Sequence, residues 1–426
     1  MERRRLSLSA ETSDSSAPRC AQLDGYHLVA IVVIGALVAV AATIMLMRAM
    51  YPFDLYIWAE SPFLTNMLKI RAAQPFYGPI SDANSFVYPP GMEMLHTAIL
   101  APFGLALSAT ANRLLVLLYG VFTAYFLTAA LREMVPLSTP RSLIAFGVLY
   151  LTQAAGTTSD TLHPDNIHIL LHSVVFWLTL RALRGSLRAA VCAVFLGGVA
   201  VYFKQTAALL GAGSGLCIAA LARTDHRVRI AAPIVGISLT ALSLTSLLRN
   251  ADAKEWVLSL MASHPVTWWR LSELRLDLIV AALATMLALA VVPVKALPTA
   301  DLYRYGNEVQ RAIDEAVRNG ERVLLAHGTA WLIKAGALDV PLDRANSILE
   351  VNVARREADL GTLQRIRERY YDRIFINSPW YGPVIEGAIR EHYQKVGEIP
   401  FGQHPHGGER GFQGLFYAVQ IYVKKP

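Results

Sequence analysis

An uninterrupted apolar run at residues 27–47, HLVAIVVIGALVAVAATIMLM, contains no acidic residue, lysine or arginine. Each residue of a helix adds about 1.5 Å, so a helix over this range would be about 30 Å long. That length matches the hydrocarbon core of a bilayer, which is also about 30 Å thick. We therefore predict a membrane-spanning helix at 27–47, and this helix is the first constraint on the fold.

The composition extends this prediction to most of the chain. Of the 426 residues, 54% are hydrophobic and only 17% are charged, and the mean hydropathy is +0.38. An ordinary soluble domain has about a quarter of its residues charged. The apolar residues dominate from Tyr26 to about Pro298, and charged residues return from there to the end. We predict a polytopic α-helical membrane domain at 25–297 and a small soluble α/β domain at 298–426.

Further apolar segments predict the other helices of the membrane domain. Together with the first run they give about eight or nine transmembrane or re-entrant helices, at 92–107, 112–131, 142–156, 166–182, 187–203, 205–222, 229–248 and 275–294. Clusters of cationic residues near positions 181–188 and 223–229 are expected to face the cytoplasm. Residues 1–24, with arginines at positions 3–5 followed by many Ser and Thr residues, are expected to be a disordered cytoplasmic tail.

Segment 92–107 leaves two topologies open. If this segment crosses the membrane, the loop at 157–166 lies on the side opposite Asp54. If it is a short re-entrant helix, which Pro102 and Gly104 favour, the loop lies on the same side as Asp54, and Arg132 and Arg141 become cytoplasmic. The arginines favour the second arrangement, but the sequence does not decide between the two.

The first outer loop, residues 48–91, carries two acidic residues close to the end of the first span. Asp54 and Glu60 lie among aromatic residues and prolines. Acidic groups held at the mouth of a membrane helix are candidates for a catalytic base or a metal ligand. The alternative is that both carboxylates are simply solvated.

Polar residues also interrupt the later apolar segments. Lys204 and Gln205 separate two apolar runs, and a lysine there could hold a lipid phosphate or could extend from a turn to the membrane surface. Asp165, in the triplet His163-Pro164-Asp165, could belong to a site or could cap the next helix. His168 and His172 lie four residues apart and could form a metal pair or pack in the core, with no third ligand evident. Cys20, Cys192 and Cys217 show no spacing typical of a disulfide framework or a zinc site.

The order of these motifs resembles the GT-C class of membrane glycosyltransferases over about residues 25–222. The nearest likeness is to bacterial relatives of protein O-mannosyltransferases and aminoarabinose transferases. The matching features are Asp54 and Glu60 after the first span, Gln74-Pro75-Phe76-Tyr77, Tyr88-Pro89-Pro90 before the next apolar segment, Asn112-Arg113-Leu114, His163-Pro164-Asp165 and Lys204-Gln205.

The resemblance implies a multi-pass enzyme of a bacterial inner or plasma membrane. Its donor would be a polyprenyl-phosphate sugar, and its acceptor a lipid, glycan or protein outside the membrane, with no nucleic acid involved. It implies Asp54 as catalytic base or metal partner, with Glu60 and Asp165 as accessory acids that could share a divalent metal ion. The remaining implied roles are phosphate binding by Lys204, Arg113 and Arg71 and accessory roles for His163, Tyr88 and Gln205.

The chain also departs from this pattern, and two other functions stay open. Few spans follow residue 222, and the stretch 250–273, with Trp256, Trp268 and Trp269, is expected to lie along the membrane interface. A shortened chain could be a non-catalytic member of the fold. A transporter of a lipid-linked anion would also need charged groups in the membrane, although no internal repeat is evident.

The C-terminal region alternates helices and strands, which predicts a small α/β domain. Helices are expected at 301–318, 356–370 and 382–396, and strands at 321–327, 373–378 and 415–423. His327-Gly328 is expected to form a turn. The resembled family places such a tail outside, over the membrane site, where Trp380, Tyr381 and residues 402–413 could contact the acceptor or form a surface loop. The span count leaves the side of this domain open.

Overall fold

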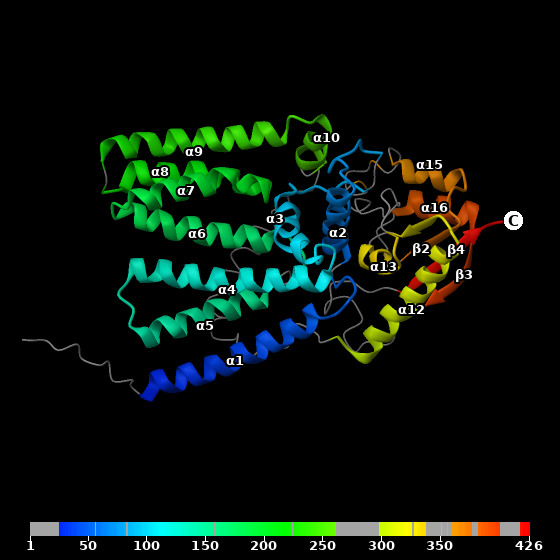
Figure 1. Ribbon diagram of the computed structural model, residues 1–426, viewed down its shortest axis with the longest axis horizontal. Helices are drawn as coiled ribbons and strands as arrows, with labels where there is room; N and C mark the ends of the chain where they lie inside the picture. The colour runs from blue at the N-terminus through cyan, green and yellow to red at the C-terminus, as the bar shows by residue number, and fades with distance from the viewer. Residues whose placement is uncertain are drawn as a thin grey trace, which may run out of the picture.

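The computed structural model describes residues 25–55, 57–81, 84–156, 159–223, 225–260, 298–325, 328–337, 351, 356, 360–376, 382–400 and 418–426. These residues form a helical bundle and, at one of its ends, a small α/β domain (Figure 1). Several sequence-based predictions lie outside the described residues: the tail 1–24, the span 275–294, Trp268 and Trp269, His327, Trp380 and Tyr381, and residues 402–413.

The bundle contains four helices long and apolar enough to cross a membrane: α1 (Gly25–Ala49), α4 (Ala109–Met134), α6 (Asp165–Leu183) and α9 (His226–Leu247). Shorter helices run beside them (Figure 1): α5 (Thr139–Ala155), α7 (Leu187–Val199) with the 3-10 turn η2 (Ala200–Tyr202), and the turn η3 (Gln205–Ala207) leading into α8 (Ala208–Leu221). The prediction of a mostly helical chain with several helices long and apolar enough to span a membrane is confirmed. Four full-length spans are found among the described residues, fewer than the eight or nine segments expected.

The bundle surface and interior have the composition that lipid requires. Large apolar side chains such as Leu28, Leu209 and Leu242 are more than half exposed. Inside, α6, α7, α8 and α9 pack through small residues, among them Ala189 and Ala232. Small residues let helix backbones approach closely, which matters in a membrane because lipid tails leave no hydrophobic driving force between helices.

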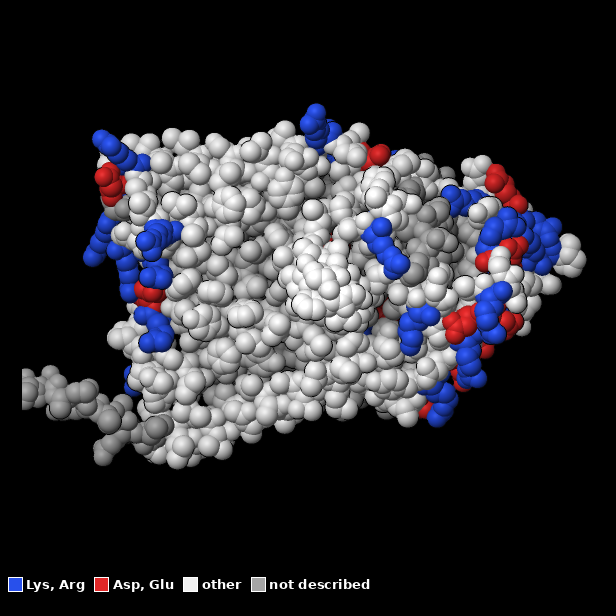
Figure 2. All heavy atoms as spheres, in the orientation of Figure 1, with Lys and Arg blue, Asp and Glu red and all other residues white. Residues whose placement is uncertain are grey.

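Charged residues mark the two ends of the bundle. Figure 2 shows a broad band almost free of charge between a cationic end and the α/β domain. The cationic end, here the arginine end, carries Arg181 and Arg184, both within salt-bridge distance of Glu133. The opposite end, here the Asp54 end, carries the loop after α1. The positive-inside rule predicts that the arginine end of a bundle with this charge pattern would face the cytoplasm.

Two short helices, α2 (Ile57–Arg71) and α3 (Gly91–Leu100), run across the Asp54 end rather than along the bundle (Figure 1). The sequence predicted only a loop where α2 lies. At 1.5 Å per residue, α3 is about 15 Å long, too short to cross a bilayer. It continues into the turn η1 (Ala101–Phe103) and ends at Gly104, whose φ of 69° lies in the left-handed region. Segment 92–107 is therefore a short helix followed by a turn, as the second of the two topologies expects, and its place relative to a membrane stays a prediction.

The remaining elements belong to the C-terminal domain or lead to it. They are α10 (Ala251–Lys254), the π-helical η4 (Glu255–Leu260), α12 (Ala300–Arg318), β1 (Val323–Leu325), α13 (Thr329–Lys334), α15 (Gly361–Arg367), β2 (Arg373–Ile376), α16 (Gly382–His392), β3 (Tyr393–Ile399) and β4 (Val419–Lys424). The sheet order is β1-β2-β4-β3, with β1 and β2 parallel and the other pairs antiparallel. The α/β prediction is confirmed.

One strand of this domain was missed by the sequence. The helix expected at 382–396 ends at His392, and Tyr393 begins the edge strand β3, which pairs with β4 along its length. A shift in register between Lys395 and Gly397 interrupts the pairing. The helical pattern of α16 continues into residues that tertiary pairing holds as a strand, since β-strand preference depends on such context. The charged helix expected at 356–370 is shorter, covering only α15.

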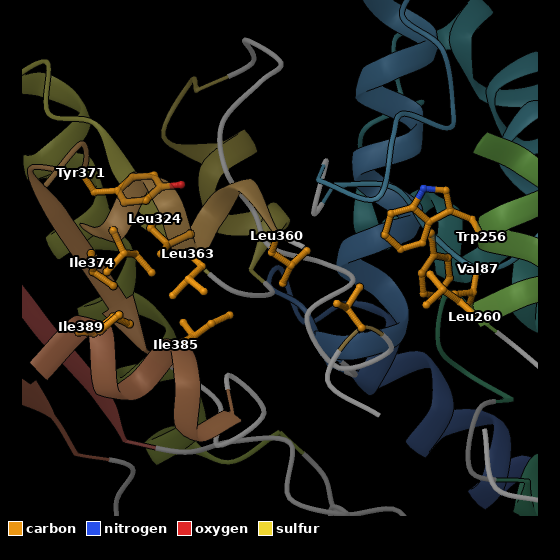
Figure 3. Packing of buried hydrophobic residues seen from close by; sticks show 14 of the residues in the cluster. Val87, Trp256, Leu260, Leu324, Leu360, Leu363, Tyr371, Ile374, Ile385 and Ile389 are labelled. Atoms are coloured by element: carbon orange, nitrogen blue, oxygen red, sulfur yellow. The ribbon is translucent and has the colours of Figure 1, made fainter. Parts of the chain in front are cut away.

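The C-terminal domain and the first outer loop share their cores. Tyr51, Phe53 and Leu55 pack against α12, β1 and α13. A second core contains Val87 and Trp256 together with residues of the sheet, α15 and α16. Figure 3 shows Val87, Trp256 and Leu260 on one side and Leu324, Ile374, Ile385 and Ile389 around the sheet and α16 on the other, with Leu360 between them. The domain is therefore packed onto the Asp54 end of the bundle.

Candidate functional site

Asp54 lies in the loop between α1 and α2 and is completely buried. Its Oδ2 accepts a hydrogen bond of 3.0 Å from the amide of Ala330. Its Oδ1 has no hydrogen-bond partner among the described residues. Burial, and then the negative charge of Glu60, raise the pKa of Asp54 to about 7, against the lowering effects of the Ala330 amide and of Arg113. A carboxyl group with this pKa can gain or lose a proton at neutral pH.

The C-terminal domain covers Asp54 through the first residues of α13. Ser61 Oγ on α2 accepts hydrogen bonds from the amides of Gly328 at 2.5 Å and Thr329 at 2.7 Å. The Thr329 hydroxyl lies 3.0 Å from Ser61 Oγ and 2.9 Å from Thr65 Oγ1. The domain therefore lies at the same end of the bundle as Asp54, and which side of a membrane that end faces stays a prediction.

Glu60 and Arg113 form a buried ion pair instead of opening onto a substrate. Arg113 Nε lies 2.8 Å from Glu60 Oε1, and Nη2 lies 2.7 Å from Oε2. The guanidinium also donates to the carbonyl oxygens of Tyr51 and Phe53, the latter at 2.5 Å. Glu60 accepts the amides of Leu55 at 2.5 Å and of Leu162 at 3.2 Å.

This geometry corrects two sequence-based roles. Arg113 is fully buried and its donors are taken by Glu60 and the loop carbonyls, so it is not placed to hold a donor phosphate. Glu60 is equally enclosed and is not an accessible acid. Both residues instead fix the backbone on either side of Asp54. The third expected phosphate ligand, Arg71, is exposed on the last turn of α2.

Five of the predicted residues do meet, and we name them the Lys204 cluster: Tyr88, His163, Asp165, Lys204 and Gln205. Lys204 forms an ion pair with Asp165, and its ammonium lies 5.5 Å from the centre of the Tyr88 ring. His163 Nδ1 lies 3.1 Å from Asp165 Oδ2, and the His163 and Tyr88 rings meet edge to face at 5.5 Å. Gln205 Nε2 donates to the carbonyl of Val87 at 3.4 Å.

Local backbone features place these side chains. Lys204 has an extended backbone between the turns η2 and η3, with φ −158° and ψ 133°. From this break between α7 and α8 its side chain reaches Asp165. Gly91 at the start of α3 packs against this break, where an added Cβ would lie 2.7 Å from the carbonyl carbon of Tyr202. Asp165 is the first residue of α6, and the N-cap position before it is taken by Pro164. Its side chain binds Lys204 instead, so capping does not account for it.

The three carboxylates expected to share a metal ion do not form one ligand set. Glu60 is taken up by Arg113 and two amides, and Asp165 by Lys204 and His163. Among the described residues, no three His, Cys, Asp or Glu side chains are grouped closely enough to hold a metal ion. The rings of His168 and His172 lie 4.1 Å apart, but they too lack a third ligand. The residues present therefore do not fit the metal site that the resemblance implied.

An apolar groove begins one turn of α6 beyond Asp165. Its volume is about 630 Å³ and it lies between α4, α6 and α8. His168 and His172 lie at the end nearer the Lys204 cluster, and Thr179 lies toward the arginine end. The lining between them is almost entirely apolar, with residues such as Phe176 and Leu210. The Lys204 cluster lies beyond the His168 end of this groove, and none of its five residues lines the groove itself.

Sequence reasoning missed a second buried ion pair, between Arg48 at the end of α1 and Asp160. This pair brings the loop 159–164 to the Asp54 end, together with the hydrogen bond from the Leu162 amide to Glu60. A signal was present, because Arg48 is the first charge after an apolar span and Asp160 lies just before the His163-Pro164-Asp165 triplet. The sequence did not say that the two meet.

Comparisons with protein-family models, with curated proteins and with solved structures find no match to this chain. The GT-C resemblance therefore rests on the motifs alone. What the chain does has to be argued from the Lys204 cluster, the groove and the surroundings of Asp54.

Proposed function

We propose that this chain is a membrane glycosyltransferase. It would transfer a sugar from a polyprenyl-phosphate donor to a lipid, glycan or protein acceptor on the Asp54 side of the membrane. The observation that carries the proposal is the position of the Lys204 cluster about one helical turn before the His168 end of an apolar groove. A polyprenyl phosphate has the same two parts, a long apolar chain and an anionic head.

Lys204 is the residue best placed to hold the donor phosphate. Its side chain is 18% exposed and that of its partner Asp165 is 32% exposed, so solvent reaches the pair. A phosphate oxygen can take the place of the Asp165 carboxylate on the ammonium, because both are anionic acceptors of charge-assisted hydrogen bonds. The apolar chain would then lie along α6 and α8, beyond His168.

The transfer itself needs a proton acceptor and a stabilised leaving group. The acceptor hydroxyl oxygen bonds to the anomeric carbon, the bond from that carbon to the phosphate oxygen breaks, and the phosphate leaves with the bonding electrons. Lys204 stabilises the negative charge on the phosphate. The hydroxyl proton passes to a carboxylate, for which the pKa of Asp54, about 7, is suitable. In this role Asp54 acts only after residues 328–330 move away from it.

We also propose that α5, α7 and α8 cross the membrane with the four long helices, in a bacterial inner or plasma membrane. Cysteine labelling in a background without native cysteines tests this topology. Ala72 follows α2 and Ser138 precedes α5, and both are exposed. A cysteine at 72 should react with an impermeant maleimide from outside the cell, and a cysteine at 138 only after permeabilisation. Labelling of both from outside refutes the arrangement.

Donor titration tests the proposed function directly. A radiolabelled polyprenyl-phosphate sugar is titrated against purified wild type, Lys204→Gln, Lys204→Arg and, as a control, Lys254→Gln, whose lysine is exposed on α10 at the same end. Lys204→Gln should lose about tenfold in affinity, or about 1.4 kcal/mol. Lys204→Arg should retain part of it, since the charge remains. Equal affinity in all four proteins would remove the phosphate role of Lys204.

The same donor separates the transferase from a transporter of lipid-linked anions. The groove supports this second candidate as well, because it extends along the membrane-crossing helix α6. In proteoliposomes a transporter moves the intact donor between leaflets. A transferase releases polyprenyl phosphate and passes the sugar to an acceptor, and turnover should fall by about a hundredfold in Asp54→Asn. Donor binding without either outcome identifies a non-catalytic member of the fold.

A further inference from the structure

A group of polar side chains lies buried between α2, α3 and α4 and takes no part in the proposed transfer. We name it the Glu93 seam, and its members are Asn66, Glu93, His96, Thr97, Tyr119 and Thr123. Glu93, His96 and Thr97 lie on one face of α3, and Tyr119 and Thr123 lie four residues apart on α4. Glu93 is 3% exposed and His96 is fully buried.

The hydrogen bonds around His96 show which nitrogen of its ring carries a proton. Asn112 Nδ2 donates to the carbonyls of Ala106 and Ser108, at 2.7 and 2.8 Å, so its Oδ1 is the acceptor. His96 Nδ1, which lies 2.8 Å from that Oδ1, therefore carries a proton. His96 Nε2 is left facing the seam, and the ring packs edge to face on Phe63 and Tyr119.

Each member of the seam has a buried polar atom that makes no hydrogen bond among the described residues. These atoms are Asn66 Oδ1, Glu93 Oε2, His96 Nε2, Thr97 Oγ1, Tyr119 Oη and Thr123 Oγ1. Folded proteins contain few such atoms, and those present are commonly satisfied by buried water, which makes about three hydrogen bonds. Donors and acceptors are both present here, as a chain of water molecules requires.

Among the residues that the structure describes, no salt bridge joins Glu93 to a cation. Its Oε1 accepts a hydrogen bond of 2.8 Å from the neutral amide of Asn66. Among the described residues, the titratable groups near it are His96, one turn further along α3, and the phenol of Tyr77. Lys69, one turn beyond Asn66 on α2, directs its ammonium to the carbonyl of Phe76. A buried carboxylate without a cation is costly and commonly takes up a proton instead.

We propose that Glu93 is a proton-binding site, a neutral carboxylic acid that donates from Oε2 to water molecules lying along the seam. The seam extends from the Asp54 end to Thr123, which lies about 21 Å along α4 from its first residue at 1.5 Å per residue. It therefore leads from the mouth of the bundle toward the middle of the membrane. The inference does not rest on the proposed transferase activity, because protons and water are detected without substrate.

Infrared spectroscopy of the purified full-length protein tests this proposal. A protonated carboxyl group has a carbonyl stretch distinct from that of a carboxylate, and the band shifts when the proton is exchanged for deuterium. We expect Glu93→Gln to remove one protonated carboxyl band at slightly acidic pH. The matched control is Glu133→Gln, because Glu133 lies at the arginine end, paired with Arg184, and is expected to be ionised. This control should leave the band unchanged.

Deuterium oxide then tests for water in the seam. In the wild type the Glu93 band should shift within minutes of transfer into deuterium oxide, since a hydrated seam exchanges readily. Thr123→Val and Tyr119→Phe, which remove hydroxyl groups from the seam, should change the frequency of the band without abolishing it. These variants keep the test usable if Glu93→Gln does not fold. An ionised Glu93 across the acidic and neutral range overturns the proton site, and a band that never exchanges overturns the hydrated seam.

Discussion

The Arg113–Glu60 pair gives the sharpest test of how the Asp54 end is built, through the variant Arg113→Met. The methionine fills similar space but leaves the Glu60 carboxylate buried without its cation. It also leaves the carbonyls of Tyr51 and Phe53 without their donor. Loss of one partner of a buried pair typically costs about 3–5 kcal/mol, because the remaining charge is uncompensated. That cost is a large part of the roughly 5–15 kcal/mol that stabilises a typical protein.

Thermal unfolding in lipid nanodiscs measures this effect. For a chain of 426 residues a loss of 3–5 kcal/mol corresponds to a fall in Tm of roughly 3–6 °C, at about 1 °C per kcal/mol. The control is Arg132→Met, because Arg132 lies on the same helix but is exposed at the arginine end, where a substitution should cost less than about 0.5 kcal/mol. Glu60→Gln in the Arg113→Met background should restore part of the stability, since the amide carries no charge.

Equal Tm values for the Arg113→Met and Arg132→Met proteins would refute this reasoning. They would mean that water or another cation compensates Glu60 when the guanidinium is removed. The double variant distinguishes this from a general loss of packing. If charge is the cause, the double variant unfolds at a higher temperature than Arg113→Met alone, and if packing is the cause it does not.

Two further predictions concern Gly91 and Asp54. Gly91→Ala should lower donor affinity about tenfold, because the new Cβ displaces the backbone before Lys204, whereas Gly35→Ala, with open space around it, should not; a titration of both variants decides this. Because burial raises the pKa of Asp54 to about 7, its contribution to stability is complete below its ordinary pKa of about 3.9 and is lost as the pH rises through about 7. The loss of unfolding free energy is roughly 4 kcal/mol. In Asp54→Asn this pH dependence should be absent, so a plot of Tm against pH should be flatter than in the wild type.

The helices were predictable because their signal is local. A run of apolar residues, such as 27–47, needs no knowledge of the rest of the chain, and α1 extends only a few residues beyond it. Strands β1, β2 and β4 were predictable for a similar reason, since each is a short apolar run between polar stretches. By contrast, β3 follows α16 without a break, and only its pairing with β4 makes it a strand.

The site was predictable in part. The sequence could select candidate residues by their type, but it could not show which of them contact each other. Residue type and position selected Lys204, Asp165 and Glu60, because charged residues are unusual beside apolar runs. The other cluster members and Arg113 were selected by the GT-C resemblance, and neither route could show that Arg113 and Glu60 bind each other. That fact depends on α4 approaching the loop after α1, which is a contact between residues 53 positions apart. The Glu93 seam was missed because Glu93 alone, near a predicted loop, resembles an ordinary solvated residue.

Three ion pairs described at the Asp54 end differ in their exposure to solvent, and their roles differ accordingly. Glu60–Arg113 and Arg48–Asp160 are almost completely buried, and each ties a loop to the end of a helix. Buried pairs of this kind add little net stability compared with apolar packing, but removing one partner is costly. Lys204–Asp165 is partly exposed, so water or a ligand can compete for either charge. The buried pairs therefore suit the fixing of loop geometry, and the exposed pair is the one whose charges a substrate can reach.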